Sequence, residues 1–422
     1  MRNIFTFFAV GKAECTMNFG IAKGGALKVS LQKHTDKAVA LRVVLIVTLL
    51  VVVLLGIPGK SYPVLQGACS SCHTMHNSQG GDPMNLDSST TPNTGLTRAT
   101  CYGCHAQGGS SPTVNLGPNI VPQVMHSGAT HLAGGNFGYI TGMAGSGASD
   151  SKGHNISDLT GTDSVFAGFK PPPGALIVVA GGGPHPGWAF LRSDILGCAG
   201  VNGCHGYRAI GGSAAYFVNG ITGAHHRNVG GKLDNPTEHA NSYRFLFGVK
   251  GYESPDWQEN PSVLNHNEYY GRQQPVQLGC SATSCHQPPG GIVKPANGTI
   301  SQFCATCHGN FHTLANGDTE GVGSSANSPF KRHPTDLSLP STGEYAAYTI
   351  YRLDAPVARI AVPDAPSSVV TPGSDAVMCL SCHLAHASNY PDILRWDYNT
   401  LTAGNGGAAS GTGCFACHSN KD

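Results

Sequence analysis

Charge is scarce in this chain. Its 422 residues include 25 Lys or Arg and 24 Asp or Glu, so charged residues make up 12%, against about 25% in ordinary soluble domains. Long apolar runs are scarce too. The uncharged run from Val43 to Leu55 has thirteen residues, whereas a membrane-spanning helix needs about 20. The run is therefore too short for a comfortable membrane span.

Glycine is present in excess. The chain has 57 Gly, about twice the average usage. A chain rich in Gly and poor in charge loses much conformational entropy on folding and has few side chains with which to recover it. This composition argues against an ordinary packed core and suggests that something other than side chains organises the fold.

Fourteen of the fifteen cysteines belong to one repeated arrangement, in which two cysteines are followed directly by a histidine. Five copies have the spacing C-x-x-C-H, which is typical of covalent haem c attachment. They are Cys69-Cys72-His73, Cys101-Cys104-His105, Cys304-Cys307-His308, Cys379-Cys382-His383 and Cys414-Cys417-His418. Two copies have longer gaps: Cys198-Cys204-His205 and Cys280-Cys285-His286. The pattern predicts seven covalently bound haem c groups, each with a proximal histidine ligand to iron.

Two simpler explanations compete with haem. Zinc ribbons pair cysteines in the same way, but they do not need a histidine after every second cysteine. Disulfides suit an exported chain but leave seven Cys-His dipeptides unexplained. For Cys198 and Cys204, which have the longest gap, a disulfide or two free thiols stays open as an alternative.

Residues 1–61 differ from the rest and predict an export leader. They hold eight Lys or Arg and two acids, and the apolar run begins directly after Arg42. A basic segment, an apolar segment and small residues before Tyr62 are the parts of a signal peptide. An uncleaved N-terminal anchor is the alternative, and Met17 is a second possible start. Without the leader the chain has 17 Lys or Arg and 22 Asp or Glu, which argues against a nucleic-acid partner.

The remaining histidines supply a second ligand for each iron. Of 20 His, His34 lies in the leader and seven follow cysteines, so twelve remain for seven irons. Histidine is the commonest metal ligand among side chains. The predicted distal set is His76, His126, His154, His226, His312, His333 and His386, with His225 and His266 in reserve. Methionine, the other axial ligand to consider, is much less abundant.

The expected fold is mostly irregular coil with a few short helices and small β elements, stapled together by haem. Residues 62–422 form one heptahaem region without a confident internal boundary. Short strands are expected at Tyr243–Val249, Gly343–Arg352, Pro356–Val362 and Leu176–Ala180, where apolar residues alternate or β-branched residues gather.

Several strings resemble the outer-surface multihaem cytochromes of electroactive, metal-reducing bacteria, some of which form filaments. They are Cys-His-Thr-Met-His-Asn-Ser at 72–78, Gly-Gly-Asn-Phe-Gly-Tyr at 134–139, Lys-Gly-His-Asn-Ile at 152–156, Arg-His-Pro at 332–334 and Cys-Leu-Ser-Cys-His-Leu-Ala-His-Ala-Ser at 379–388. The resemblance spans about residues 65–420. It implies bis-His haems in a close-packed chain and electron transfer to redox proteins or extracellular acceptors. It also implies that His76 ligates a haem of an adjoining subunit.

Two functions compete on this sequence. An electron conduit needs saturated irons and no catalytic residues, whereas a multihaem periplasmic reductase needs one iron with an open position. Such reductases often replace one proximal histidine by lysine, and the sequence contains no C-x-x-C-K. The surplus of histidine also favours the conduit, so the chain is expected to be an electron carrier rather than an enzyme. Either role fits an exported location in the periplasm, at the outer surface or outside the cell.

Overall fold

The computed structural model divides the chain into two compact units, Met1–Ser61 and Tyr62–Asp422. The described residues of the first unit are 4–6, 16–21 and 27–31. Those of the second are 67–156, 196–206, 230–273, 298–308, 333–404 and 412–421, without positions 87, 146 and 200–202, together with 159, 173, 221 and 311. The boundary between the units coincides with the predicted end of the leader, whose cleavage stays a prediction.

The first unit contains one small antiparallel sheet. Its strands are β1 (Ile4–Thr6), β2 (Thr16–Ile21) and β3 (Leu27–Leu31), with β2 in the middle. The apolar run from Val43 to Leu55 lies outside the described residues. Within the part of the chain that is described, no helix has the length and apolar character needed to cross a bilayer.

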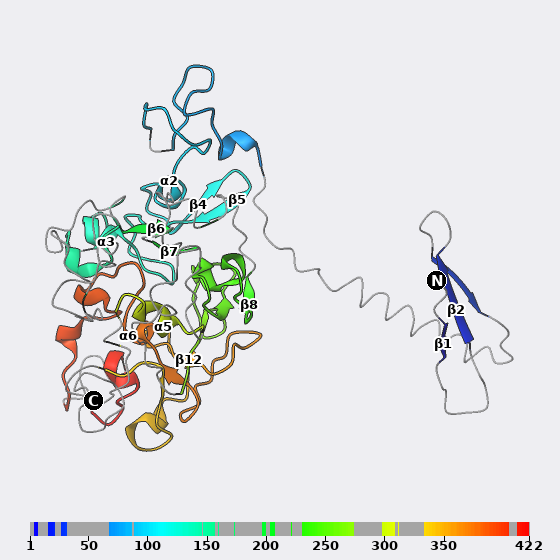
Figure 1. The fold of residues 1–422 in the computed structure, drawn as a ribbon. Coiled ribbons are helices and arrows are strands. Elements are labelled where there is room, and N and C mark those ends of the chain that lie inside the picture. Colours follow the sequence, from blue (N-terminus) through cyan, green and yellow to red (C-terminus); the bar gives the residue numbers. More distant parts are fainter. Residues whose placement is uncertain are drawn as a thin grey trace, which may run out of the picture. The chain divides into compact units, whose positions relative to one another are not determined.

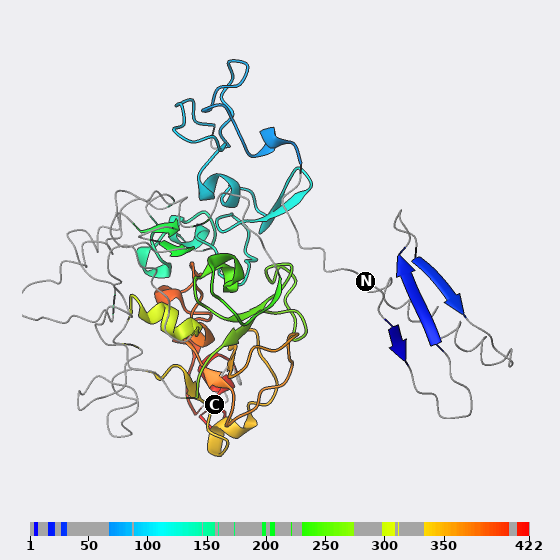
Figure 2. The same ribbon diagram turned by 45° about the vertical axis from the view of Figure 1, so that its right-hand side comes forward.

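Regular elements in the second unit are short, as the glycine content predicts (Figures 1 and 2). The α-helices are α2 (Cys101–His105), α3 (Gly138–Thr141), α5 (Ile300–Ala305) and α6 (Cys379–Cys382). The 3₁₀ helices are η1 (Cys69–Ser71), η2 (Asp150–Lys152), η5 (His239–Asn241), η6 (Tyr243–Phe245), η8 (Gly343–Ala347), η9 (Pro391–Ile393), η10 (Tyr398–Thr400) and η11 (Gly413–Ala416). The mainly irregular fold with a few short helices agrees with the expected class.

Among the described residues, a six-stranded sheet is the largest regular feature. Its order is β11 (Leu337–Ser338), β13 (Ala376–Val377), β12 (Ala358–Arg359), β10 (Glu268–Tyr270), β9 (Gly251–Glu253) and β8 (Gly231–Leu233). Neighbours are antiparallel except β10 and β12, which are parallel. The two-stranded pairs are β4 (Thr113–Leu116) with β5 (Asn119–Pro122), and β6 (Gly197–Ala199) with β7 (Gly203–His205). The sheet brings residues from 231 to 377 into one small frame.

Three of the strings that resemble known cytochromes meet around the fully buried Ala387. Gly135 and Gly153 each form a β-bridge with Ala387. His386 N–H donates to the Gly134 carbonyl at 2.7 Å, and His154 N–H donates to the His386 carbonyl at 3.0 Å. The segments 134–139, 152–156 and 379–388 thus form one junction, with Phe137, Tyr139, Ile140, Ala144, Ile156 and Ala387 as its apolar cluster.

Two of the strand predictions are wrong. Tyr243–Val249 forms η6 and a turn, because Arg244 and Phe245 adopt positive φ angles of 47° and 59°. Gly343–Arg352 begins with η8 and is not a strand. Pro356–Val362 contains the two-residue strand β12, and Leu176–Ala180 lies outside the described residues.

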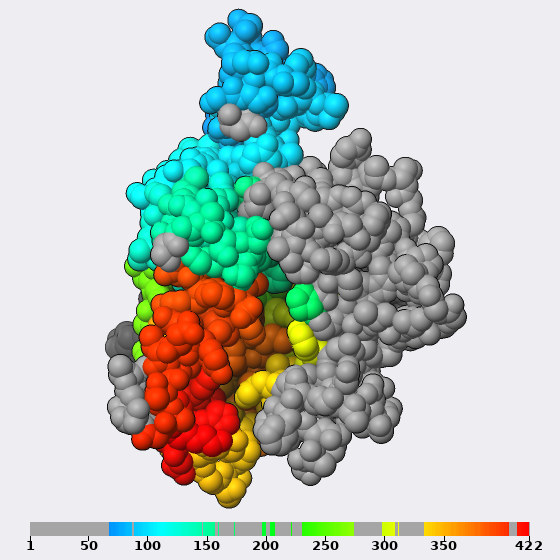
Figure 3. Space-filling view, turned by 90° about the vertical axis from the view of Figure 1, so that its left-hand side faces the viewer, coloured from blue at the N-terminus to red at the C-terminus, as the bar shows by residue number. Residues whose placement is uncertain are grey.

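The N-terminal part of the second unit projects from one end. Residues 67–100, in blue, extend beyond the other segments, and the C-terminal motif, in red, lies toward the opposite end (Figures 1 and 3). The first and last cysteine motifs are therefore far apart in the second unit.

Candidate haem-binding sites

Each C-x-x-C-H motif lies on a short helical turn. They occupy η1, α2, the end of α5, α6 and η11. In four motifs the histidine N–H donates to the carbonyl of the first cysteine, at 2.8 Å for His73, 3.0 Å for His308, 3.1 Å for His383 and 3.0 Å for His418. Residues three apart on a helix share one face, so both thiols point to the same side. None of the twelve described cysteines forms a disulfide.

The motif with a five-residue gap has another geometry. Cys198 lies in β6 and Cys204 in β7, and these strands are parallel, with Gly197 opposite Gly203 and Ala199 opposite His205. The register therefore sets the two cysteines side by side. A Cβ at Gly203 would come within 2.4 Å of Ala199 backbone atoms, so the close approach needs glycine. The other irregular motif, Cys280, Cys285 and His286, lies outside the described residues.

The histidine that follows each motif is oriented by a hydrogen bond at Nδ1. The acceptor is a backbone carbonyl for His73 (Leu96, 3.2 Å), His105 (Pro122, 2.8 Å), His205 (Arg244, 2.8 Å), His308 (Pro173, 2.6 Å) and His383 (Asp392, 2.7 Å). A carbonyl only accepts, so Nδ1 carries the proton and Nε2 is the nitrogen whose lone pair could bind a metal. Such second contacts are usual for metal-binding histidines.

His418 differs from these five. Its Nδ1 lies 3.1 Å from Oε1 of Glu344, a carboxylate on η8. Lys421 Nζ lies 3.3 Å from the same oxygen. Burial opposes ionisation of Glu344, but the hydrogen bonds from His418 and Lys421 outweigh it and hold the pKa of that carboxyl below its usual range.

Three pairs of histidine rings lie at the separation that one iron between them requires. The ring centres are 6.0 Å apart for His154 and His308, 6.1 Å for His205 and His386, and 6.2 Å for His333 and His418. Metal–imidazole bonds of about 2.0–2.1 Å, with about 1.1 Å from ring nitrogen to ring centre, put two imidazoles across one metal about 6.2 Å apart. Each pair joins a proximal histidine to one of the predicted distal histidines.

Burial keeps two of these distal candidates neutral. Desolvation, reinforced by neighbouring histidines, lowers the pKa of His154 to about 4 and that of His386 to about 3. Only neutral imidazole binds a metal. His154 Nδ1 also donates to the Ala385 carbonyl at 2.8 Å, which leaves its Nε2 for a metal.

His76 is exposed on a rigid turn. Its φ is 56°, and its Nδ1 donates to the Asn93 carbonyl at 2.8 Å. The buried Asn77 next to it accepts from Met84 N–H at 2.7 Å and Asn85 N–H at 2.6 Å. Its amide nitrogen donates to the Ser89 and Thr91 carbonyls. The ring of His76 is thus held with Nε2 available at the surface.

The other distal candidates fit less completely. His126 is fully buried and its Nε2 has no hydrogen-bond partner, but its Nδ1 accepts from Gly128 N–H at 3.2 Å instead of donating. His226, His312 and the reserve His225 lie outside the described residues. His131 was not in the predicted distal set. Desolvation is the main cause that lowers the pKa of both His131 and His383, and Arg395, which lies near both rings, lowers the two pKa values further.

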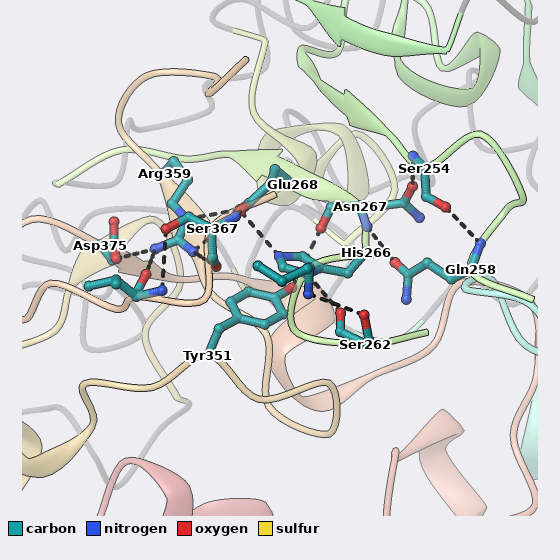
Figure 4. A network of polar contacts seen from close by, with 12 residues as sticks. Ser254, Gln258, Ser262, His266, Asn267, Glu268, Tyr351, Arg359, Ser367 and Asp375 are labelled. Atoms are coloured by element: carbon teal, nitrogen blue, oxygen red, sulfur yellow. Dashed lines mark hydrogen bonds and ion pairs between the residues drawn. The ribbon is translucent and has the colours of Figure 1, made fainter. Parts of the chain in front are cut away.

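His266, the other reserve, belongs to a different site (Figure 4). Its Nδ1 lies 3.1 Å from the Ser262 carbonyl and its Nε2 lies 3.1 Å from Glu268 Oε1. The ring stacks on Tyr351 at 3.8 Å, and Arg359 joins Glu268 to Asp375. Both ring nitrogens are therefore engaged within the protein, and neither is free for iron.

Cysteines of different motifs lie close together. Cys379 forms a side-chain hydrogen bond with Cys304 that, with desolvation and the thiol of Cys204, raises the pKa of the Cys304 thiol well above its usual value. Desolvation and the thiol of Cys72 raise the pKa of Cys104 to about 11, and desolvation with Cys414 and Cys417 raises that of Cys382 to about 12. Attachment sites of neighbouring haems are thus adjacent in the fold.

These residues fit haem c. Across the described part of the chain, no group of three or more His, Cys, Asp or Glu could hold a bare metal ion. A haem iron asks only two ligands of the protein, because the macrocycle supplies the other four, and two imidazoles per site are what the ring pairs provide.

A family model described as "Doubled CXXCH motif" matches residues 371–422, which hold the last two motifs. The chain is 25% identical over 384 residues to C-type cytochrome OmcS of Geobacter sulfurreducens, covering 82% of this chain and 83% of that protein. A solved structure, the Outer Membrane Cytochrome S Filament from the same organism, aligns over 84% of this chain and 94% of its own, with 18% identity and a TM-score of 0.38.

Proposed function

We propose that this chain is a multihaem c-type cytochrome of the outer-surface type, which carries electrons along a chain of seven bis-His haems. The observation that carries the proposal is the three ring pairs at 6.0–6.2 Å, each of which joins a proximal to a distal histidine. Two histidines on one iron leave no open position for a substrate. The reductase alternative needs such a position.

The proposed ligands follow from these pairs. The paired distal ligands are His154 for His308, His386 for His205 and His333 for His418. His76, His126, His226 and His312 complete the set for the other four irons. Haem supplies one-electron redox chemistry when bound, while the protein sets its ligands, spacing and surroundings.

The adjacent attachment sites support a path between haems. Cys104 lies near Cys72, Cys304 near both Cys204 and Cys379, and Cys382 near Cys414. Thioether bonds hold each macrocycle at its cysteines, so neighbouring cysteines bring macrocycle edges together. Electrons then pass from one attachment site to the next without a substrate pocket.

Export and assembly are further parts of the proposal. The relative matched over most of both chains is a c-type cytochrome, and the matched solved structure is an outer-membrane cytochrome filament. The leader of residues 1–61 provides a route to the same location. We propose that copies of this chain also assemble end to end, with His76 completing an iron in the adjoining copy.

The haem count and spin state test the central proposal. Intact mass of the secreted protein is expected to show seven haems, and the oxidised protein is expected to be low-spin throughout at neutral pH. Five haems would remove the two irregular motifs. A stoichiometric high-spin signal or tight cyanide binding at one haem would favour a reductase.

The assembly role is tested with His76→Ala. Because the ring is exposed and its hydrogen bond goes to the Asn93 carbonyl, outside the Cys69–His73 motif, the variant is expected to keep its haem content. It is expected to lose or shorten its filaments and to show one high-spin haem per subunit. Met75→Ala, at the neighbouring residue with 64% exposure, is the matched control and should assemble normally. A His76→Ala protein that stays low-spin and assembles unchanged contradicts the proposal.

A further inference from the structure

Glu344 lies against the proximal histidine of the last motif. Five proximal histidines place Nδ1 against a neutral backbone carbonyl, whereas Nδ1 of His418 lies 3.1 Å from a carboxylate oxygen of Glu344. Sequence gives no hint of this contact, because Glu344 and His418 are 74 residues apart.

The structure holds the carboxylate in place. Glu344 is in the first turn of η8, and the hydroxyl of Ser419 donates to its backbone carbonyl. Its side chain is 15% exposed. The Tyr345 ring packs edge-on against His418, with ring centres 5.2 Å apart. The contact therefore belongs to a built site rather than to a mobile surface side chain.

A carboxylate changes the ligand that it touches. A carboxylate that accepts from Nδ1–H draws the proton toward its oxygen, and this makes the imidazole a stronger electron donor to iron. A stronger donor stabilises ferric over ferrous iron and so lowers the reduction potential. A neutral carbonyl does this to a smaller extent, because charge-assisted hydrogen bonds are roughly twice as strong.

Lys421 opposes this effect only in part. Its ammonium shares Oε1 of Glu344 at 3.3 Å, but its side chain is 59% exposed. Exposed ion pairs are weak and screened by salt, whereas His418 and Glu344 are 24% and 15% exposed.

We propose that Glu344 is a positioning residue that holds the haem of the Cys414–His418 motif at a more negative potential than a carbonyl acceptor would. The proposal rests on the proposed function, because it requires haem on that motif. Cys382 lies next to Cys414 and Cys417. An electron on the haem of the Cys414–His418 motif is therefore driven toward the haem of the Cys379–His383 motif. The C-terminal haem then passes electrons on and does not retain them.

Glu344→Gln is the test, since it keeps an acceptor oxygen and removes the charge. Potentiometric titration of the holoprotein is expected to show one haem shifted to a more positive midpoint potential. Its low-spin electron paramagnetic resonance signal, which reports axial imidazole donor strength, should change as well. Asp354→Asn is the matched control. Asp354 also lies near the last motif, where desolvation, then Cys414 and then Asp354 raise the pKa of Cys417. It is also paired with a cation, Arg352 at 3.0 Å, but the carboxylate that contacts Nδ1 of His418 is that of Glu344.

The outcomes separate this proposal from the proposed function. A Glu344→Gln shift no larger than that of Asp354→Asn, with an unchanged resonance signal, overturns the role of Glu344 while seven low-spin haems keep the cytochrome proposal intact. Absence of haem from the Cys414 peptide in the unaltered protein overturns the proposed function instead. If Glu344→Gln fails to mature, Lys421→Gln decides at low ionic strength, where salt screens the ion pair least: a more negative midpoint of one haem supports the proposal, and no shift contradicts it.

Discussion

The partners of each imidazole nitrogen determine what a histidine can do in this protein. A carbonyl at Nδ1 leaves Nε2 free, as in His308 with its acceptor Pro173. Acceptors at both nitrogens give a structural histidine, as in His266. His126 accepts at Nδ1, so as a ligand it would carry more negative charge on its ring than the others. Equal residue types thus have unequal chemistry.

Removing one distal ring tests the pairing residue by residue. His386→Ala is expected to leave haem content unchanged and to convert one haem to the high-spin, cyanide-binding form, because the iron on His205 loses its second ligand. Visible and electron paramagnetic resonance spectra measure this change.

The control for that variant is Phe137→Leu. Phe137 stacks on His386 with ring centres 4.9 Å apart, so the change disturbs the packing but keeps the imidazole. It should stay low-spin. If His386→Ala also stayed low-spin and bound no cyanide, the pairing of His386 with His205 would be wrong.

The attachment residues can be predicted from the sequence, because two cysteines and a histidine on one turn form a local pattern; their attachment to haem stays a prediction. It does not predict the acceptors, since every residue has a carbonyl and nothing marks Leu96, Pro122 or Arg244. The contact of Glu344 with His418 was not predicted, because the two residues are 74 positions apart in the sequence. His266 was considered as a distal ligand because a count of histidines does not show that its ring nitrogens already have partners, Ser262 and Glu268.

Among the elements, the junction around Ala387 depends on glycines. A Cβ at Gly135 would meet the Ala387 carbonyl oxygen at 2.0 Å, and its φ is 93°. A Cβ at Gly153 would meet Ile140 at 2.4 Å and Ala387 at 2.6 Å. Strand prediction failed at Tyr243–Val249 because alternation of apolar residues does not report the positive φ angles that turn the chain there.

Gly135→Ala is expected to open this junction. The clash involves backbone on both sides, so it cannot be relieved by rotating a side chain, and strain at positive φ adds about 1–3 kcal/mol. We expect a lower urea midpoint and high-spin signals from the irons of both His154 and His386.

Gly147→Ala is the control for the glycine variant. Gly147 also has a positive φ, 86°, but has open space around its Cβ direction. It therefore carries the φ strain without the clash and should keep its low-spin spectrum. Equal effects of the two variants would show that close approach at Gly135 is unimportant.

The six-stranded sheet contains a second critical element, the buried carboxylate of Glu268 on β10. It accepts from Arg359 Nε at 2.8 Å and Ser367 N–H at 2.7 Å, and faces His266. Burial opposes its ionisation, but the hydrogen bonds from His266 and Arg359 outweigh it and hold the pKa of Glu268 below its usual range. For the partner carboxylate burial prevails, and the pKa of Asp375 is raised.

Glu268→Gln is expected to lower the free energy of unfolding at neutral pH by about 3–5 kcal/mol, because it breaks a buried charge network from one side. The stabilisation from Glu268 is present above its unfolded pKa of about 4.3 and is lost as pH falls through the lower folded value. Asp375 contributes with the opposite sign and offsets part of it. Urea unfolding between pH 3 and 7 measures both effects.

The exposed Asp364, which pairs with Lys232 and has 92% side-chain exposure, provides the control. Asp364→Asn should change stability by less than about 0.5 kcal/mol. If Glu268→Gln behaved like Asp364→Asn, the network would contribute nothing measurable to stability.

At the scale of the second unit, the described cysteine motifs extend from the projecting segment of residues 67–100 to the C-terminal motif (Figure 3). The class of fold was predictable from composition, because glycine and scarce charge leave little for a side-chain core. The order of the sites was not, since it arises from contacts such as Cys304 with Cys379 that join distant parts of the chain.

The mature protein is expected to begin near Tyr62. The basic segment, the apolar run after Arg42 and the small residues before Tyr62 favour cleavage there, at the boundary between the two compact units. N-terminal sequencing of exported material provides the measurement. Recovery of Val43–Leu55 in that material would instead indicate an uncleaved anchor.

The junction at Ala387 also bears on the order in which the haem ligands come together during export. A chain that crosses a membrane N-terminus first delivers His205 and its cysteines long before His386 arrives. Under the proposed pairing of His205 with His386, a haem attached at that point keeps one face open until His386 has crossed. On the proposed function, the partly exported chain is therefore a different chemical species from the finished one. It is expected to bind small ligands such as carbon monoxide for a time, and to lose this reactivity as the C-terminal segment closes over segments 134–139 and 152–156.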